Sequence, residues 1–270
     1  MTHLVDVSQE PHQSAIWPRL RIEAATVAAG EPILASMLHA VILNHERLED
    51  ALGYVLASKI GGVNMNDMQV REICDQALHE NPDIIRRVEA DFQAVLERDP
   101  ACKGFLQPFL FFKGFLALQT QRIAHQLWRD ERQTLALFFQ SRVSELFAVD
   151  IHPATRIGAG IMLDHATGIV FGETAVIGDN VSIMQDVTLG GTGAERGDRH
   201  PKIEEGVLIG AGAKVLGNIT VGHHARIAAC SVVLKNVAPH CTVAGIPAKP
   251  VGGECCPEPA RSMDHMLVED

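Results

Sequence analysis

The stretch IHPATRIGAGIMLDHATGI, residues 151–169, decides the fold of this chain. It places an aliphatic residue at every sixth position, and the same period continues to residue 233 after one interruption. Twelve of the thirteen repeats begin with Ile, Leu or Val, a regularity that chance does not produce and that is typical of a repeat architecture. The leading residues are Ile151, Ile157, Leu163, Ile169, Ala175, Val181, Val187, Ile203, Ile209, Val215, Val221, Ile227 and Val233.

A period of six fits a coil with three sides. A short strand followed by a tight turn, repeated three times, closes one triangular coil of about 18 residues and points one aliphatic residue per side inward. Coils stacked at the strand separation of about 4.8 Å give every backbone group between the end coils a partner. Thirteen repeats make just over four such coils, so the sequence predicts a parallel β-helix. The repeat alone does not fix the hand of this helix.

The interruption of the repeat is a candidate functional loop. Ten extra residues, GAERGDRHPK at 193–202, separate the repeat that begins at Val187 from the one that begins at Ile203. Insertions in solenoid proteins form surface loops, often on the binding face. Because this loop contains Arg199 and His200 among glycines, we expect it to take part in binding or catalysis.

The first half of the chain has a helical period instead. The dipeptide Asn-Pro at 81–82 predicts the start of a helix, which ends at Asp99 before a proline. A second candidate helix begins at Pro108 and runs to Trp128. The fold class is therefore α+β. The predicted domains are an all-helical domain at 1–148, the β-helix at 149–250 with its inserted loop at 193–202, and a flexible tail at 251–270 that is rich in glycine and proline.

The composition excludes several classes of function. A formal net charge of −10, without a clustered basic face, argues against a nucleic-acid partner. The most apolar stretch, 105–118, is interrupted by polar residues and is shorter than the roughly 20 residues that span a bilayer. The six cysteines have neither metal-ligand nor disulfide spacing, and the N-terminus lacks the features of a signal peptide. We expect a cytoplasmic protein with reduced thiols, no membrane segment and no nucleic-acid partner.

His165 is the strongest candidate for a catalytic base. It lies inside a repeat, two residues after an inward aliphatic residue, and an imidazole has a pKa near working pH. Asp150 precedes it by 15 residues, three short of one coil, so we expect the two side chains to be neighbours on adjacent coils. With Arg199 and His200 nearby, the set suits the transfer of an acyl group to an alcohol. The chain has no nucleophile elbow, Walker loop or dinucleotide-binding motif, which favours direct transfer.

Two other sets of polar residues each allow two interpretations. Asp99 ends a predicted helix, where a carboxylate opposes the helix macrodipole. It is therefore either a solvated turn residue or a group held ready for a cation. His165, His200 and one of His223 and His224 are conceivable metal ligands, as in the γ-class carbonic anhydrases that share this β-helix. Their spacing gives that site little support, and we expect no metal.

Eight short motifs carry a family resemblance: EPILAS (31–36), RDPA (98–101), DIHPA (150–154), GIMLDHATG (160–168), VTLGGTG (187–193), GDRHPK (197–202), GAGAKVLGN (210–218) and AGIPA (244–248). They resemble the signature motifs of bacterial serine acetyltransferases, which belong to the hexapeptide-repeat acyltransferases. The resemblance covers about residues 15–252. It is specific because sugar acetyltransferases of this fold have neither the helical half nor the Arg-His-Pro insertion in this form. It implies that the β-helix is left-handed.

The resemblance implies a catalytic role for three residues. His165 would be the general base on the hydroxyl of L-serine, Asp150 would orient it, and His200 would be a second imidazole near the reacting oxygen. Acetyl-CoA would be the co-substrate and would lie in a groove between neighbouring subunits. Its candidate contacts are Gly191, Thr192, Ala211, Gly212 and Lys214.

The same resemblance implies how serine is held and how the enzyme is regulated. Arg199 would pair with the serine carboxylate through its forked guanidinium, and Asp99 and Asp164 would hold the serine ammonium group. L-Cysteine differs from L-serine in one atom, so we expect it to compete for the same clamp and to inhibit the first step of cysteine biosynthesis. The resemblance also implies a hexamer, made of two trimers joined through their helical domains.

Two alternatives and one partner remain open at this point. The chain is alternatively a hexapeptide acyltransferase for a sugar or another amino alcohol, or a non-catalytic scaffold. Many members of the family end in isoleucine, which inserts into the partner enzyme O-acetylserine sulfhydrylase. This chain ends MLVED at 266–270, so we expect that complex to be weakened or absent.

Overall fold

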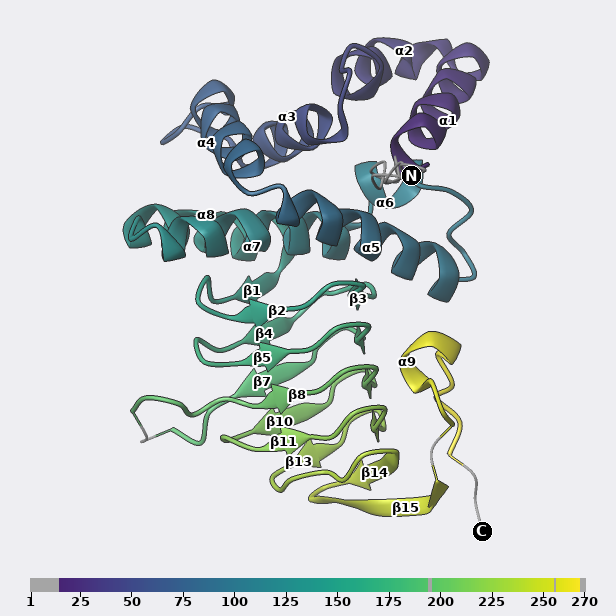
Figure 1. Ribbon diagram of the computed structural model, residues 1–270, viewed down its shortest axis with the longest axis vertical. Coiled ribbons are helices and arrows are strands. Elements are labelled where there is room, and N and C mark those ends of the chain that lie inside the picture. Colours follow the sequence, from purple (N-terminus) through teal and green to yellow (C-terminus); the bar gives the residue numbers. More distant parts are fainter. Residues whose placement is uncertain (1–14, 194–195, 255, 268–270) are drawn as a thin grey trace, which may run out of the picture.

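The computed structural model describes residues 15–193, 196–254 and 256–267. A helical domain stands on one end of a column of stacked strands (Figure 1). The helical elements of this domain are α1 (Ile16–Gly30), α2 (Pro32–Leu38), the π-helix η1 (His39–Leu43), α3 (Leu48–Ile60), α4 (Asp67–Glu80), α5 (Asp83–Arg98), α6 (Leu106–Leu110), α7 (Lys113–Arg129) and α8 (Gln133–Phe147).

One of the two helix predictions is confirmed and the other needs a correction. Helix α5 ends at Arg98, with Asp99 as its C-cap residue, as the sequence predicts. The helix predicted from Pro108 to Trp128 is divided between α6 and α7, because the backbone of Phe112 is extended and interrupts the helical hydrogen bonds. Within the described ranges, no helix is long and apolar enough to cross a membrane.

Three sheets form the sides of the column, and their coils repeat from top to bottom in Figure 1. We name them sheet A (β1, β4, β7, β10, β13), sheet B (β2, β5, β8, β11) and sheet C (β3, β6, β9, β12, β14, β15). Adjacent strands are parallel except β14 and β15. The predicted fold class is confirmed: an all-helical domain is followed by a left-handed parallel β-helix. The strands are β1 (Val149–Ile151), β2 (Arg156–Ile157), β3 (Met162–Leu163), β4 (Ile169–Phe171), β5 (Val176–Ile177), β6 (Ser182–Ile183), β7 (Thr188–Gly190), β8 (Lys202–Ile203), β9 (Leu208–Ile209), β10 (Lys214–Leu216), β11 (Thr220–Val221), β12 (Arg226–Ile227), β13 (Val232–Val233), β14 (Cys241–Gly245) and β15 (Ala248–Glu254).

The strand register reveals a second interruption of the repeat. In the lower coils, paired residues are 18 apart, as in the pair Lys214 and Val232. In the first coil, Asp150 pairs with Val170, 20 residues later. Because the preceding strand β3 also pairs in this register, the two additional residues lie in the turn 164–168. The uninterrupted coil assumed for Asp150 and His165 is therefore wrong.

The inserted loop is correspondingly shorter than the sequence predicts. Val176 pairs with Lys202, 26 residues later, so the loop adds eight residues to a coil instead of ten. The sequence gave no means to see this because aliphatic residues on both sides of a turn are buried. Val181 and Ile183 both have no exposed surface, so either phase of the repeat fits the hydrophobic pattern.

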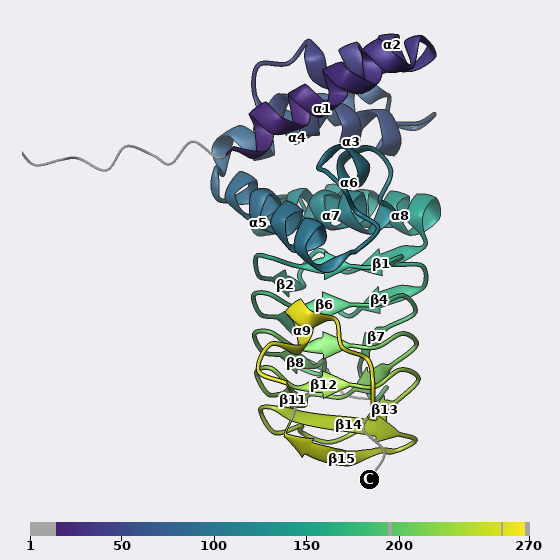
Figure 2. The same cartoon turned by 90° about the vertical axis from the view of Figure 1, so that its right-hand side faces the viewer.

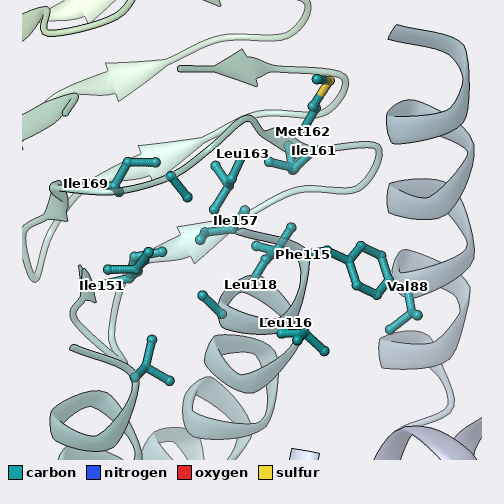
Figure 3. Close-up of a cluster of buried hydrophobic side chains, with 14 of the residues drawn as sticks. Val88, Phe115, Leu116, Leu118, Ile151, Ile157, Ile161, Met162, Leu163 and Ile169 are labelled. Atoms are coloured by element: carbon teal, nitrogen blue, oxygen red, sulfur yellow. The ribbon is translucent and has the colours of Figure 1, made fainter. Parts of the chain in front are cut away.

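Apolar packing joins the helical domain to the first coil. Figure 3 shows Phe115 and Leu118 of α7 against Ile157 and Leu163 of the β-helix, with Val88 of α5 beside the phenyl ring. These side chains belong to one hydrophobic cluster that continues from the helices into the column. The continuous core fixes α5 and α7 over the end of the β-helix.

Polar side chains complete the same junction by pairing the backbone groups of the uppermost coil. The Arg122 guanidinium donates to the carbonyl of Gly158 (2.8 Å) and pairs with the buried Asp91 carboxylate (2.7 Å). Asp91 also accepts from the backbone N–H of Ile161 (2.9 Å). The first coil has no strand above it, so these side chains satisfy groups that would otherwise be buried without partners. Other residues that donate to backbone groups there are Arg87, Arg98 and Gln121.

The C-terminal segment folds back over sheet C. Strand β15 pairs antiparallel with β14, so the predicted boundary at 250 falls inside a strand. The segment predicted as a flexible tail then forms α9 (Pro259–Ser262), which lies across sheet C in Figure 2. Ser182 donates its hydroxyl to the carbonyl of Ala260 (2.8 Å), and Arg226 pairs with Asp264 (3.1 Å). The tail therefore has defined contacts that its glycines and prolines did not indicate. The MLVED ending lies partly outside the described residues.

Candidate active site

Two edges of sheet A collect the candidate site residues. We name the turns that lead from sheet C into sheet A the CA edge, and those that lead from sheet A into sheet B the AB edge. The two edges flank the same sheet on opposite sides. The CA edge comprises the turns 164–168, 184–187, 210–213 and 228–231, and the AB edge comprises 152–155, 172–175, 191–201 and 217–219.

The widened turn of the first coil carries His165 on the CA edge. His165 and Ala166 both have positive φ angles, 54° and 58°, a conformation that this turn of two additional residues imposes. The imidazole consequently stands away from the column, and 72% of its side-chain surface is exposed. Its Nε2 lies 3.7 Å from Oδ2 of Asp164. An exposed imidazole beside a carboxylate is free to take a proton from a substrate.

A cavity of about 510 Å³ brings the first three candidate residues together. Asp99 from the end of α5 lines it together with Asp164 and His165 from the β-helix. Burial raises the pKa of the Asp164 carboxyl, the His165 imidazole opposes this rise, and the negative charge of Asp99 adds to it. Two carboxylates that repel each other in this way attract a cation. The arrangement agrees with the interpretation of Asp99 as a group that holds an ammonium.

The AB edge holds the second group of candidates. Arg199 donates to the Glu173 carboxylate (2.9 Å), and His200 is 93% buried, with only 7% of its surface exposed. The backbone N–H of Thr174 donates to His200 Nδ1 (3.2 Å), and the Thr174 hydroxyl lies 2.8 Å from the same atom. Burial lowers the pKa of His200, and the charge of Arg199 lowers it further. The ring is therefore neutral near pH 7, with its proton on Nε2.

A glycine makes room for this buried imidazole. A Cβ atom at Gly172 would lie 2.0 Å from Nε2 of His200, so any side chain at that position would displace the ring. Gly172 and Thr174 belong to the coil above the loop, and together they fix the ring from two sides. The loop therefore holds His200 in one orientation.

Asp150 lies outside the His165 cavity. Its side chain leaves the outer face of β1 and accepts from Gln140 of α8 (2.6 Å). Its charge raises the pKa of His152, which burial lowers, so its carboxylate lies toward the AB edge. No hydrogen bond or ion pair joins Asp150 to His165 in the part of the chain that the structure describes. The expected contact between these two residues is thus absent within one chain.

The candidate contacts of acetyl-CoA divide in the same way. Ala211 and Gly212 form a turn of the CA edge, and the Lys214 ammonium reaches back to the Asp186 carboxylate there (2.9 Å). Gly191 and Thr192 stand at the opposite edge, at the start of the inserted loop. Each edge thus carries about half of the predicted substrate contacts and half of the predicted co-substrate contacts.

Comparison with known proteins identifies the family. Residues 16–120 match the family model "Serine acetyltransferase, N-terminal", and residues 200–235 match "Bacterial transferase hexapeptide (six repeats)". A serine acetyltransferase of Escherichia coli K12 is 54% identical over 250 residues, which are 93% of this chain and 92% of that protein. The chain belongs to the serine acetyltransferase family. Its activity is serine O-acetyltransferase, so the sugar-acetyltransferase and scaffold alternatives are wrong.

Solved structures of serine acetyltransferases agree with this assignment. The enzyme from Vibrio cholerae superposes with a TM-score of 0.92 at 52% identity, over 93% of this chain and 97% of that one. Two further structures hold ligands. A Neisseria gonorrhoeae enzyme in complex with serine has a TM-score of 0.86 at 54% identity, over 88% and 98% of the two chains. A Brucella abortus enzyme in complex with coenzyme A has a TM-score of 0.88 at 50% identity, over 90% and 97%.

Several residues of this serine acetyltransferase site escaped the sequence analysis. Glu173 and Thr174 contact Arg199 and His200, but they belong to a different coil, and only the strand register reveals that they are neighbours. Lys113, the first residue of α7, lines the cavity and donates to the hydroxyl of Thr167. A lysine at a helix N-terminus opposes the macrodipole, which is a sequence signal that could have drawn attention to it.

The three-histidine metal site does not form within one serine acetyltransferase chain. His165 stands on the CA edge and His200 on the AB edge, whereas His223 and His224 lie in the turn between β11 and β12, at the third corner of the coil. Among the described residues, no group of three or more His, Cys, Asp or Glu side chains is arranged to hold a metal.

Proposed function

We propose that this serine acetyltransferase transfers acetyl directly from acetyl-CoA to serine in a site that two copies of the chain complete. The observation that carries this proposal is the division of the candidate residues between opposite edges of sheet A. His165 and its two carboxylates lie at one edge, and Arg199 and His200 lie at the other. A contact between the CA edge of one copy and the AB edge of the next unites both sets, and such head-to-tail contacts close into a ring.

Apolar residues on the same side of the molecule support this assembly. Val170 and Leu234, from the sheet A side of the column, are 40% and 50% exposed, and Leu137 and Leu146 of α8 are 43% and 42% exposed. A triangular column whose adjacent edges meet suits a ring of three. Further exposed aliphatic side chains, Ile22, Ile33 and Met68, stand on the helical domain and support the joining of two trimers into a hexamer.

Serine is held by charges from both copies. Its ammonium lies between the carboxylates of Asp99 and Asp164, and its carboxylate pairs with the guanidinium of Arg199 from the second copy. Glu173 orients this guanidinium in the absence of substrate through the 2.9 Å contact. The hydroxyl of serine then faces His165, at the mouth of the cavity.

The reaction moves one proton and one acetyl group. His165 takes the proton from serine Oγ, which attacks the thioester carbonyl; the C–S bond breaks, and the departing CoA thiolate receives the proton from the imidazolium. Asp150 orients His165 across the contact, because its carboxylate belongs to the edge of the second copy. The neutral His200 donates its Nε2 proton to the developing oxyanion, and the acetyl-CoA chain follows the groove between Gly212 of one copy and Thr192 of the other.

Cysteine competes with serine at this clamp. It presents the same ammonium and carboxylate, so Asp99, Asp164 and Arg199 hold both amino acids, and one atom distinguishes them. A solved serine acetyltransferase in complex with cysteine has a TM-score of 0.92 to this chain, at 51% identity over 94% of it and 98% of that chain. Feedback inhibition in a cytoplasmic cysteine pathway follows. The KM for serine and the inhibition constant for cysteine should rise together in Asp99→Asn.

Subunit mixing tests the shared site. His165→Ala and Arg199→Ala are each expected to be nearly inactive as pure proteins. After subunit exchange, some contacts combine an intact CA edge with an intact AB edge, and random mixing restores about a quarter of wild-type sites in a ring. Differently tagged chains recovered together verify the exchange. If verified mixed oligomers remain inactive, each chain carries its own complete site and the proposal is wrong.

A further inference from the structure

Arg98 is buried at the junction beside the serine cavity, where it forms no ion pair with a described residue. It is the last residue of α5, directly before Asp99, and only 7% of its surface is exposed. Its Nη1 donates to the carbonyl of Gly160 (3.0 Å) and to the hydroxyl of Ser182 (3.1 Å), and its Nη2 to the side-chain carbonyl of Asn180 (3.4 Å). These acceptors are all neutral. Burial of a cation without a carboxylate costs stability, so its position requires another explanation.

The acceptors of Arg98 belong to the strands that carry the other half of the serine clamp. Gly160 precedes β3, and Asp164 directly follows that strand. Ser182 is in β6 and pairs with Met162 of β3. One guanidinium therefore ties the end of α5, where Asp99 begins, to the strand pair that ends at Asp164. The planar fork fixes direction as well as distance, which a single flexible ammonium does not do.

The hydroxyl of Ser182 is itself held in one orientation. It donates its only proton to the carbonyl of Ala260 in α9 (2.8 Å), which leaves its lone pairs for Arg98. The neighbouring residue Glu97 is held by Arg261 of the same segment (3.2 Å). The last turn of α5 is thus fixed by the β-helix and by the C-terminal segment together.

We propose that Arg98 is a positioning residue for serine binding: it holds Asp99 at the correct separation from Asp164. The proposal rests on the proposed function, in which these two carboxylates bind the serine ammonium. Arg98 touches neither substrate, so its loss acts through Asp99. A displacement of about 1 Å in a binding group can cost up to 10²-fold in rate or affinity.

Arg87 provides a matched control on the same helix. Its guanidinium also donates to a carbonyl of the first coil, that of Ile157 (2.8 Å), but it stands eleven residues before Arg98. At a rise of about 1.5 Å per residue, this separation is roughly 16 Å along α5. A residue that merely joins the domains should behave in the same way at either position.

The experiment compares Arg98→Met, Arg98→Lys and Arg87→Met in the full-length enzyme, with initial rates measured against each substrate. We expect Arg98→Met to raise the KM for serine and the inhibition constant for cysteine about tenfold. The KM for acetyl-CoA and kcat should stay within about threefold. Arg98→Lys should recover part of the loss, since it keeps the charge without the fork. Arg87→Met should leave both substrate constants near wild type.

A double-mutant cycle with Asp99→Asn tests whether Arg98 acts through Asp99. If it does, Arg98→Met adds little to the KM for serine once Asp99→Asn is present. Additive effects, or an equal rise for acetyl-CoA, would overturn the proposal. A normal KM for serine in Asp99→Asn would instead refute the serine clamp itself. A raised value there with a normal value in Arg98→Met would refute only the positioning role. Should Arg98→Met fail to fold, Arg98→Lys and Ser182→Ala take its place, with an expected rise of about two- to threefold each.

Discussion

The β-helix interrupts its repeat twice, and the two interruptions place an imidazole in opposite environments. At the CA edge, two additional residues widen a turn and leave His165 72% exposed. At the AB edge, eight additional residues form a loop that buries His200 to 93% and fixes its Nδ1 against Thr174. A repeat that supplies every backbone group with a partner has little freedom for function. This difference indicates that chemistry enters at departures from the period, and that their lengths decide how mobile each imidazole is.

Replacement of the exposed imidazole should give the largest effect. His165→Ala removes the proposed base and should lower kcat by about 10²–10⁴, while the protein folds and binds acetyl-CoA normally. Asp150→Asn should cost less, about tenfold, because the imidazole remains and only its orientation changes. Steady-state rates at saturating substrates measure both variants. Near-normal turnover in His165→Ala would remove this residue from the mechanism.

Displacement of the buried imidazole should give an intermediate effect. Gly172→Ala leaves His200 in the sequence but introduces a Cβ 2.0 Å from its Nε2 position, so the ring must leave its site. We expect kcat/KM to fall about 10- to 100-fold, the range for the loss of an oriented hydrogen-bond donor. Gly30→Ala is the control, since nothing lies within 4 Å of a Cβ there. If Gly172→Ala is fully active, the orientation of His200 has no catalytic value.

The smallest expected effect is a difference in the pH dependence of stability. Burial lowers the pKa of His200 below its value of about 6.5 in the unfolded chain. The unfolded state therefore binds the proton more readily, and stability falls as the pH drops through 6.5 toward the lower folded pKa. The exposed His165 does not contribute in this way. Thermal unfolding from pH 7.5 to 5 should give a shallower decline for His200→Asn than for wild type, and an unchanged decline for His165→Asn. Equal slopes in all three proteins would contradict this difference.

The sequence predicted the architecture well because the decisive signal is periodic. Aliphatic residues at every sixth position imply the column, and the end of α5 at Asp99 follows from one proline. The position of the interruptions could not be derived, because buried residues such as Val181 and Ile183 on either side of a turn make two phases equally hydrophobic. The expected contact between Asp150 and His165 failed for this reason. It assumed an uninterrupted first coil, whereas the register contains two more residues.

The residues brought together by long-range packing were also beyond sequence reasoning. Asp99 faces Asp164 only because α5 lies across the first coil, and no local pattern states where a helix of one domain meets a strand of another. The contacts of the C-terminal segment are a similar case. Its composition suggested flexibility, but Arg226 and Ser182 of sheet C supply partners for its backbone and for Asp264.

The polar contacts that α5 and α7 make with the first coil also protect the molecule from self-association. A stack of parallel strands presents an open ladder at each end, and such ladders recruit further strands and grow into fibrils. The Arg122 and Gln121 side chains occupy the carbonyls at the upper end, and β15 runs antiparallel across the last coil at the lower end. The helical domain therefore also serves as a stopper, and a β-helix expressed without it would begin with an unprotected edge.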